Sequence, residues 1–120
     1  MGSLEFRSEN VGGKSVNVIV VQGDLDAYSA PRLREVLTDL IAGGSDWIVV
    51  DCCTLEYIDS SGLGALVAGL KQMSDHNGTL ALAEPNDSVR RVLQVTGLDR
   101  LFPLYGNLAE ACGAGVLLNA

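Results

Sequence analysis

Short runs of Val, Ile and Leu alternate along this chain with segments of helical periodicity, and this alternation most constrains the fold. Three runs stand out, at Ser15–Gln22, Trp47–Asp51 and Thr79–Ala83, and each is short and apolar, as in a buried strand. Core strands that alternate with helices form a largely parallel sheet joined by right-handed crossovers. The order of elements therefore predicts an α/β domain.

The helical segments carry start and stop signals. Gly23 is expected to close the first buried strand, and a loop over Asp24–Pro31 leads to a helix capped by Ser29 or Ala30 and ended by Gly43-Gly44. Proline is tolerated in a first turn, where its missing N–H costs little. Three further helices are predicted, over Ser61–Asp75, Asp87–Val95 and Leu108–Cys112.

The two ends of the chain add weaker elements. A strand near Leu4–Ser8 is expected to form a hairpin with the first buried strand across a turn at Val11–Lys14, and a last short strand is predicted at Leu101–Tyr105. The sheet is thus mixed but mostly parallel, with four to five strands and about four flanking helices. Residues 1–120 are expected to form a single domain. For the tail Gly113–Ala120, packing on the domain and formation of a homodimer both stay open.

Composition and charge exclude several classes of function. The chain has 8 basic and 15 acidic residues, a formal net charge of -7, so nucleic acid and anionic membranes would be repelled. No apolar run reaches the roughly 20 residues of a membrane span, and the start lacks a secretory signal, so a cytoplasmic protein is expected. Cys52 and Cys53, at the end of a buried strand, and Cys112 lack metal-site or disulfide spacing, so they are expected to be structural. No metal and no cofactor are predicted.

The stretch Asp59–Gly64 (DSSGLG), which opens the helix predicted over Ser61–Asp75, permits three interpretations. Asp59, Ser60 or Ser61 could simply cap the helix, because a side-chain oxygen accepts one of the unpaired N–H groups of a first turn. A serine there could instead be a catalytic nucleophile. It could also be a phosphorylation site, because the helix N-terminus favours an anion and a phosphate would change binding without unfolding the domain.

The nucleophile is the weakest of these interpretations. A catalytic serine needs a base, and the single histidine, His76, lies at the opposite end of the same predicted helix. The fifteen residues from Ser61 to His76 correspond to about 22 Å of helix. The chain also lacks G-x-S-x-G and a phosphate-binding loop. The sequence therefore predicts that the protein is not an enzyme.

The helix that follows the serines has two unlike faces. A mostly apolar stripe at steps of three and four is expected to face the core: Leu63, Leu66, Val67, Leu70 and either Met73 or Ser74. The other face starts with small residues: Gly62, Gly64, Ala65, Ala68 and Gly69. Small residues let another backbone come close, at a cost of about 1 kcal/mol for each interior glycine. Two occupants stay open, a neighbouring element of the same domain and a partner protein.

Six segments together resemble the STAS domain of bacterial anti-sigma factor antagonists. The resemblance covers roughly Val18 to Ala111, and D-S-S-G-L-G in this context is its most specific signal. The segments are Gly23-Asp24-Leu25-Asp26, Ala30-Pro31-Arg32-Leu33, Val49-Val50-Asp51, Ile58 through Gly64, Thr96-Gly97-Leu98 and Leu101-Phe102-Pro103. Asp24 stands where the family more often has Glu, which keeps the charge.

This resemblance implies a mixed sheet flanked by helices and a role in partner switching. The unphosphorylated antagonist of this family binds an anti-sigma factor that is often a serine kinase, phosphorylation breaks the complex, and a serine phosphatase restores it. By position, Ser60 is the expected phosphoacceptor, with Ser61 as second choice. The implied partner-binding residues are Asp24, Asp26, Asp59, Ser61, Gly62, Leu63, Gly64 and Ala65. The alternative function is a STAS scaffold or nucleotide-sensing module that is not phosphorylated.

Overall fold

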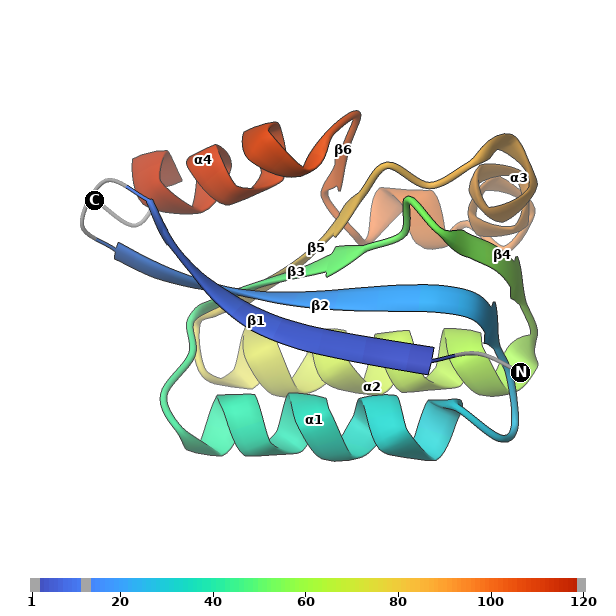
Figure 1. Ribbon diagram of the computed structural model, residues 1–120, viewed down its shortest axis with the longest axis horizontal. Coiled ribbons are helices and arrows are strands. Elements are labelled where there is room, and N and C mark those ends of the chain that lie inside the picture. Colours follow the sequence, from blue (N-terminus) through green and yellow to red (C-terminus); the bar gives the residue numbers. More distant parts are fainter. Residues whose placement is uncertain (1–2, 12–13, 119–120) are drawn as a thin grey trace.

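The computed structural model describes residues 3–11 and 14–118 of the chain. The described residues form one mixed sheet with helices on both faces (Figure 1). The strands are β1 (Ser3–Val11), β2 (Lys14–Leu25), β3 (Trp47–Asp51), β4 (Leu55–Ile58), β5 (Thr79–Ala83) and β6 (Leu104–Tyr105). The helices are α1 (Ala30–Ala42), α2 (Ser60–Asp75), α3 (Asp87–Val95) and α4 (Leu108–Leu118), with a 3-10 turn, η1 (Leu98–Arg100).

The sheet is mixed and mostly parallel, as the sequence predicts. Its order is β1-β2-β3-β5-β6, in which β1 pairs antiparallel with β2 and the other neighbours are parallel. The predicted bounds of β3, β5 and α3 agree with the structure. The predicted hairpin of β1 and β2 is confirmed, although Gly12 and Gly13 of its turn lie outside the described residues.

The first correction concerns the end of β2. The predicted loop starts too early, because β2 continues through Gly23 to Leu25 and pairs there with β4. Gly23 adopts a left-handed φ of 72°, and the register shifts between Gly23 and Asp24. Strand β2 thus pairs with β3 as far as Val20 and with β4 from Gly23 onward. The unpredicted strand β4 raises the described strands to six, where the sequence predicts four to five.

The second correction concerns the last strand, which is shorter than predicted. The N–H groups of Leu101 and Phe102 both donate to the carbonyl of Leu98, at 3.0 and 3.2 Å. These residues therefore extend the turn of η1. Strand pairing begins only after Pro103, at Leu104.

Unequal layers cover the two faces of the sheet. Helices α1 and α2 lie side by side on one face, and α4 lies on the other (Figure 1). The larger core cluster joins the sheet to α1, α2 and α3, whereas the smaller one joins Val18, Trp47 and Val49 to Ala111 and Cys112 of α4. The indole Nε1 of Trp47 donates to the carbonyl of Ala111 at 3.0 Å. Helix α4 runs six residues beyond its predicted end, so residues 113–118 of the tail are helical.

The third correction concerns α2, where only Leu66 and Met73 of the predicted core stripe are buried and where Gly62, Ala65 and Gly69 also face inward. Its buried residues are Gly62, Ala65, Leu66, Gly69 and Met73, whereas Leu63, Val67 and Leu70 are only half-buried. A Cβ on Gly69 would lie 2.7 Å from a methyl carbon of Leu37 on α1, so the small residues let α1 and α2 approach. The buried small residues therefore pack against neighbouring elements of the same domain, Gly62 against β2 and Gly69 against α1. No helix in the described part of the chain has the length and apolar composition to cross a bilayer.

Candidate functional site at the start of α2

The first turn of α2 is fixed to the sheet by Asp59. Asp59 follows β4 directly, and its Oδ1 accepts a hydrogen bond from the N–H of Gly62 at 3.1 Å. Its own N–H donates to the carbonyl of Leu25, the last residue of β2, at 3.2 Å. Of the three predicted cap candidates, Asp59 is the cap, and α2 begins one residue earlier than predicted, at Ser60.

The two serines that follow lie in different surroundings. Ser60 is exposed at the first helical position, whereas Ser61 is half-buried. Ser61 lines a shallow hollow of about 250 Å³ with Ala27, Pro31 and Arg34 at the start of α1. Since the cap is supplied by Asp59, the Ser60 hydroxyl projects to solvent from a helix start that does not depend on it.

Gly62 and Ala65, two of the predicted partner-binding residues, face the interior. A Cβ on Gly62 would lie 2.4 Å from the carbonyl oxygen of Leu25, and Ala65 is 0% exposed. Leu63 and Gly64 are half-buried on the outer side of the same turns. Gly62 and Ala65 therefore hold α2 against the domain, whereas Leu63 and Gly64 keep part of their surface exposed.

Asp26 shapes the loop between β2 and α1. Its Oδ1 accepts from the N–H groups of Tyr28 and Ser29, at 3.0 and 3.3 Å. The buried hydroxyl of Ser29 donates to the carbonyl of Asp24 at 2.8 Å and accepts from the N–H of Asp26 at 3.0 Å. This closed set of hydrogen bonds fixes the path of the chain into α1.

Asp24 and Tyr57 are neighbours in the register of β2 and β4. Asp24 is half-buried, and Tyr57 is 54% exposed. Asp59 comes two residues after Tyr57, so the pairing of β2 with β4 brings the acidic residues of two distant segments to one edge of the sheet. The sequence does not predict that Tyr57 lies beside Asp24, because it does not predict β4.

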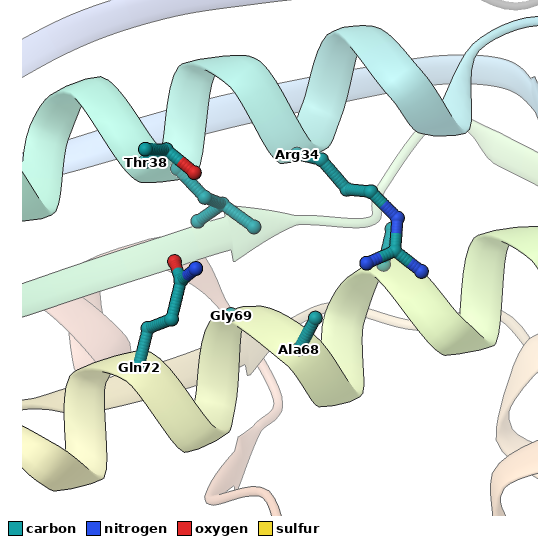
Figure 2. Close-up of a pocket in the computed structure, with 7 residues that line it drawn as sticks. Arg34, Thr38, Ala68, Gly69 and Gln72 are labelled. Carbon is teal, nitrogen blue, oxygen red and sulfur yellow. The ribbon is translucent and has the colours of Figure 1, made fainter.

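A basic side chain, Arg34, completes this region. Arg34 extends from α1 toward α2 (Figure 2), and its Nη2 would lie 3.2 Å from a Cβ on Gly64. It also lines the groove between the two helices, a cavity of about 150 Å³ whose walls include Ala68, Gly69 and Gln72. Its signal in the sequence, a helical position one turn after Pro31, is too common to have singled it out.

The histidine lies far from the serines, as expected. His76 caps the C-terminal end of α2, and its Nδ1 lies 2.9 Å from the carbonyl oxygen of Gln72. Ser60 opens the other end of the same helix. No imidazole therefore lies beside the serines to act as a base.

A second group of polar side chains gathers at the carboxyl ends of β3 and β5. Ligand atoms of Asp51, Cys53 and Glu84 lie within 4.8 Å of one another, so these residues have the types and spacing that could hold a cation. Cys53 is exposed, in contrast to its predicted place in a buried strand end, and the N–H of Cys53 donates to Asp51 at 3.0 Å. Burial, and then the charge of Asp51, raises the pKa of Cys52 to about 12, so this thiol stays protonated and unreactive.

Comparisons with known proteins agree with this architecture. The anti-sigma-B factor antagonist of Staphylococcus aureus (strain NCTC 8325 / PS 47) is 36% identical over 83 residues, which span 69% of this chain and 77% of that protein. The crystal structure of an anti-sigma factor antagonist from Mycobacterium paratuberculosis superposes with a TM-score of 0.79 at 30% identity and covers 94% of each chain. The unphosphorylated form of SpoIIAA, an anti-sigma factor antagonist of Bacillus, has a TM-score of 0.73 at 27% identity and covers 89% of this chain and 92% of its own.

The family model of the STAS domain matches residues 9–111, from β1 into α4. This range contains the β2–α1 loop, strand β4 and the start of α2, the segments that build the site described above. The chain therefore belongs to the STAS domain family.

Proposed function

We propose that this protein is an anti-sigma factor antagonist that binds its anti-sigma factor through the start of α2 and is released when Ser60 is phosphorylated. The observation that carries the proposal is the exposed hydroxyl of Ser60 at a helix start that Asp59 caps. The names of the related proteins support the role, since they are antagonists of anti-sigma factors. Binding in this role would regulate transcription without catalysis by this chain.

A phosphate on Ser60 is compatible with the fold. The side chain is exposed, so the added group displaces no packed atoms. The unpaired N–H groups and the dipole of a helix N-terminus favour an anion. The phosphorylated chain is therefore expected to stay folded and to differ from the unmodified chain chiefly in surface charge.

That charge falls in the middle of the proposed contact surface. We define this surface by Asp24, Asp59, Ser60, Ser61, Leu63 and Gly64, with Asp26 shaping its edge. The half-buried Val67 and Leu70 continue an apolar strip from Leu63 along α2. A phosphate brings about -1.5 to -2 charges, which a partner fitted to a neutral hydroxyl would have to desolvate.

Release by phosphorylation implies two enzymes that act on this chain. The anti-sigma factor itself is proposed to be the serine kinase, and a serine phosphatase would restore the unmodified form. SpoIIAA, whose structure is known in an unphosphorylated and a phosphorylated form, provides a precedent among proteins of this fold. The exposure of Ser60 suits both enzymes, because each must reach the hydroxyl or its phosphate.

Phosphoryl transfer and mass spectrometry test the proposal. The chain is incubated with ATP and the anti-sigma factor kinases encoded in the same genome, and the intact mass and the modified peptide are measured. One phosphate on Ser60 is expected, absent from Ser60→Ala and retained in Ser61→Ala. No mass gain with any of these kinases would contradict the proposal and favour a scaffold. A phosphate that maps to Ser61 would move the switch to the neighbouring hydroxyl.

A binding measurement tests the effect of the charge. Ser60→Asp is expected to weaken binding of the anti-sigma factor at least tenfold, about 1.4 kcal/mol, with an unchanged circular dichroism spectrum. Ser74→Asp, an exposed site near the other end of α2, is the matched control and should bind like the wild type. Equal affinities of the two variants would place the interface elsewhere.

A further inference from the structure

We propose that Arg34 is the counter-ion of the phosphate on Ser60, so that phosphorylation links α1 to the start of α2. The inference rests on the proposed function and adds a residue to it. Arg34 lies outside the set that the sequence assigns to the partner surface. Its guanidinium would bind the phosphate and fix its position, so Arg34 is a positioning residue.

The position of Arg34 follows from the small residues of α2. Gly64 has no side chain, and the guanidinium of Arg34 lies where a side chain would begin, with Nη2 3.2 Å from that Cβ position. Residues three and four apart on a helix have Cβ atoms about 5–6 Å apart. Gly64 is three residues from Ser61 and four from Ser60, so the guanidinium lies about one helical turn from both serines. Ser61 and Arg34 also line the same hollow.

The charges around the serines leave Arg34 available for a phosphate. Arg34 forms no ion pair among the side chains that the structure describes, whereas Arg32, on the same helix, pairs with Glu35 at 3.1 Å. Carboxylates flank the same helix starts: Asp24 and Asp26 from the end of β2 and its loop, and Asp59 from the cap. A phosphate on Ser60 would meet repulsion from these groups and attraction from Arg34.

The chemistry of the guanidinium suits this role. Arginine presents a planar set of donors that can bind two phosphate oxygens at once, and it stays charged at all physiological pH values. Its side chain is long and exposed, so a rotation of the guanidinium from its place beside Gly64 toward Ser60 needs no movement of the backbone. The phosphorylated state would then be held by two helices, and the phosphate would be less accessible to a phosphatase.

The test installs phosphoserine at position 60 during translation, so that it does not depend on a kinase. The phosphate is titrated by phosphorus NMR in four forms: wild type, Arg34→Gln, Arg34→Lys and the matched control Arg32→Gln. A nearby cation favours the doubly charged phosphate, so loss of Arg34 is expected to raise its second pKa by about half a unit. Arg32→Gln should match the wild type, and Arg34→Lys should lie between wild type and Arg34→Gln.

A second measurement follows removal of the phosphate by a broad-specificity serine phosphatase. The rate is expected to rise at least threefold in Arg34→Gln and to stay unchanged in Arg32→Gln. Equal pKa values and equal rates in these two variants would overturn the role of Arg34. That outcome would leave the modification of Ser60 itself untouched, because the mass measurement with the kinase decides it separately.

Discussion

Two helices of this protein begin at the same edge of the sheet with the same residue types, and they use them differently. At the start of α1, Asp26 and Ser29 bond to each other and to the loop, and Ser29 is buried with 7% of its surface exposed. At the start of α2, Asp59 caps the first turn and Ser60 is exposed. A serine hydroxyl is thus available for modification where a neighbouring carboxylate already satisfies the helix start.

The largest expected effect comes from the tight contact beneath the α2 start. Gly62→Ala would place a Cβ 2.4 Å from the carbonyl oxygen of Leu25 and 2.9 Å from a side-chain carbon of Ile58. Backbone cannot yield as a flexible side chain does, so we expect a loss of about 3 kcal/mol in the free energy of unfolding, measured by urea denaturation.

Gly64→Ala is the matched control for this substitution on the same helix. Its Cβ would meet only the movable end of Arg34, at 3.2 Å. Alanine is the better helix former by about 1 kcal/mol, so stability should stay the same or rise. Equal losses from both substitutions would show that the start of α2 is not pressed against β2 as described.

The second prediction compares the serine at the start of α1, Ser29, with the serine at the start of α2, Ser60. Ser29→Ala removes the hydrogen bonds of a buried hydroxyl to Asp24 and Asp26, and should lower the free energy of unfolding by about 2 kcal/mol. Ser60→Ala removes an exposed hydroxyl and should change it by less than about 0.5 kcal/mol. The comparison between the helix starts would break down if Ser60→Ala proved as destabilising as Ser29→Ala.

The smallest expected change in the free energy of unfolding concerns Asp59, where two substitutions distinguish its capping hydrogen bond from its charge. Asp59→Ala should cost about 1 kcal/mol, because the N–H of Gly62 loses its acceptor. Asp59→Asn keeps a capping oxygen and should stay within a few tenths of a kcal/mol of the wild type. Thermal unfolding of both variants gives the measurement. A loss in Asp59→Asn as large as in Asp59→Ala would mean that the carboxylate charge, and not the cap, stabilises this helix start.

Much of the fold could be predicted because its strands are short apolar runs with clear ends. Strand β4 could not, because only Leu55 and Ile58 of its four residues are buried and the other two, Glu56 and Tyr57, are exposed. The pairing of β4 with β2 begins at Gly23 and contains a register shift just after it, and local periodicity encodes neither feature. From the sequence alone, Gly23 is as compatible with the end of a strand as with a bend inside one.

The faces of α2 illustrate a second limit of sequence patterns. Periodicity places the largest apolar residues inside, but Gly62, Ala65 and Gly69 occupy the closest contacts because only small residues fit against β2 and α1. Leu63, Val67 and Leu70 are displaced to half-buried positions. Burial on this helix is decided by the distance between backbones, which becomes known only when the neighbouring elements are placed. The place of Arg34 beside the start of α2 could not be predicted for the same reason. It depends on the contact of its guanidinium with Gly64, which follows from how α1 packs on α2.

The hydrogen bond from Trp47 to α4 gives the protein a built-in optical probe. Trp47 is the single tryptophan of the chain, and it is buried against α4, on the face of the sheet opposite α1 and α2. Its fluorescence would therefore report the detachment of α4 and global unfolding. Events at Ser60, on the other side of the sheet, would leave the emission nearly unchanged. Both properties can thus be followed in one sample. Tryptophan emission reports the stability of the fold, and a fluorescent label on the partner reports binding.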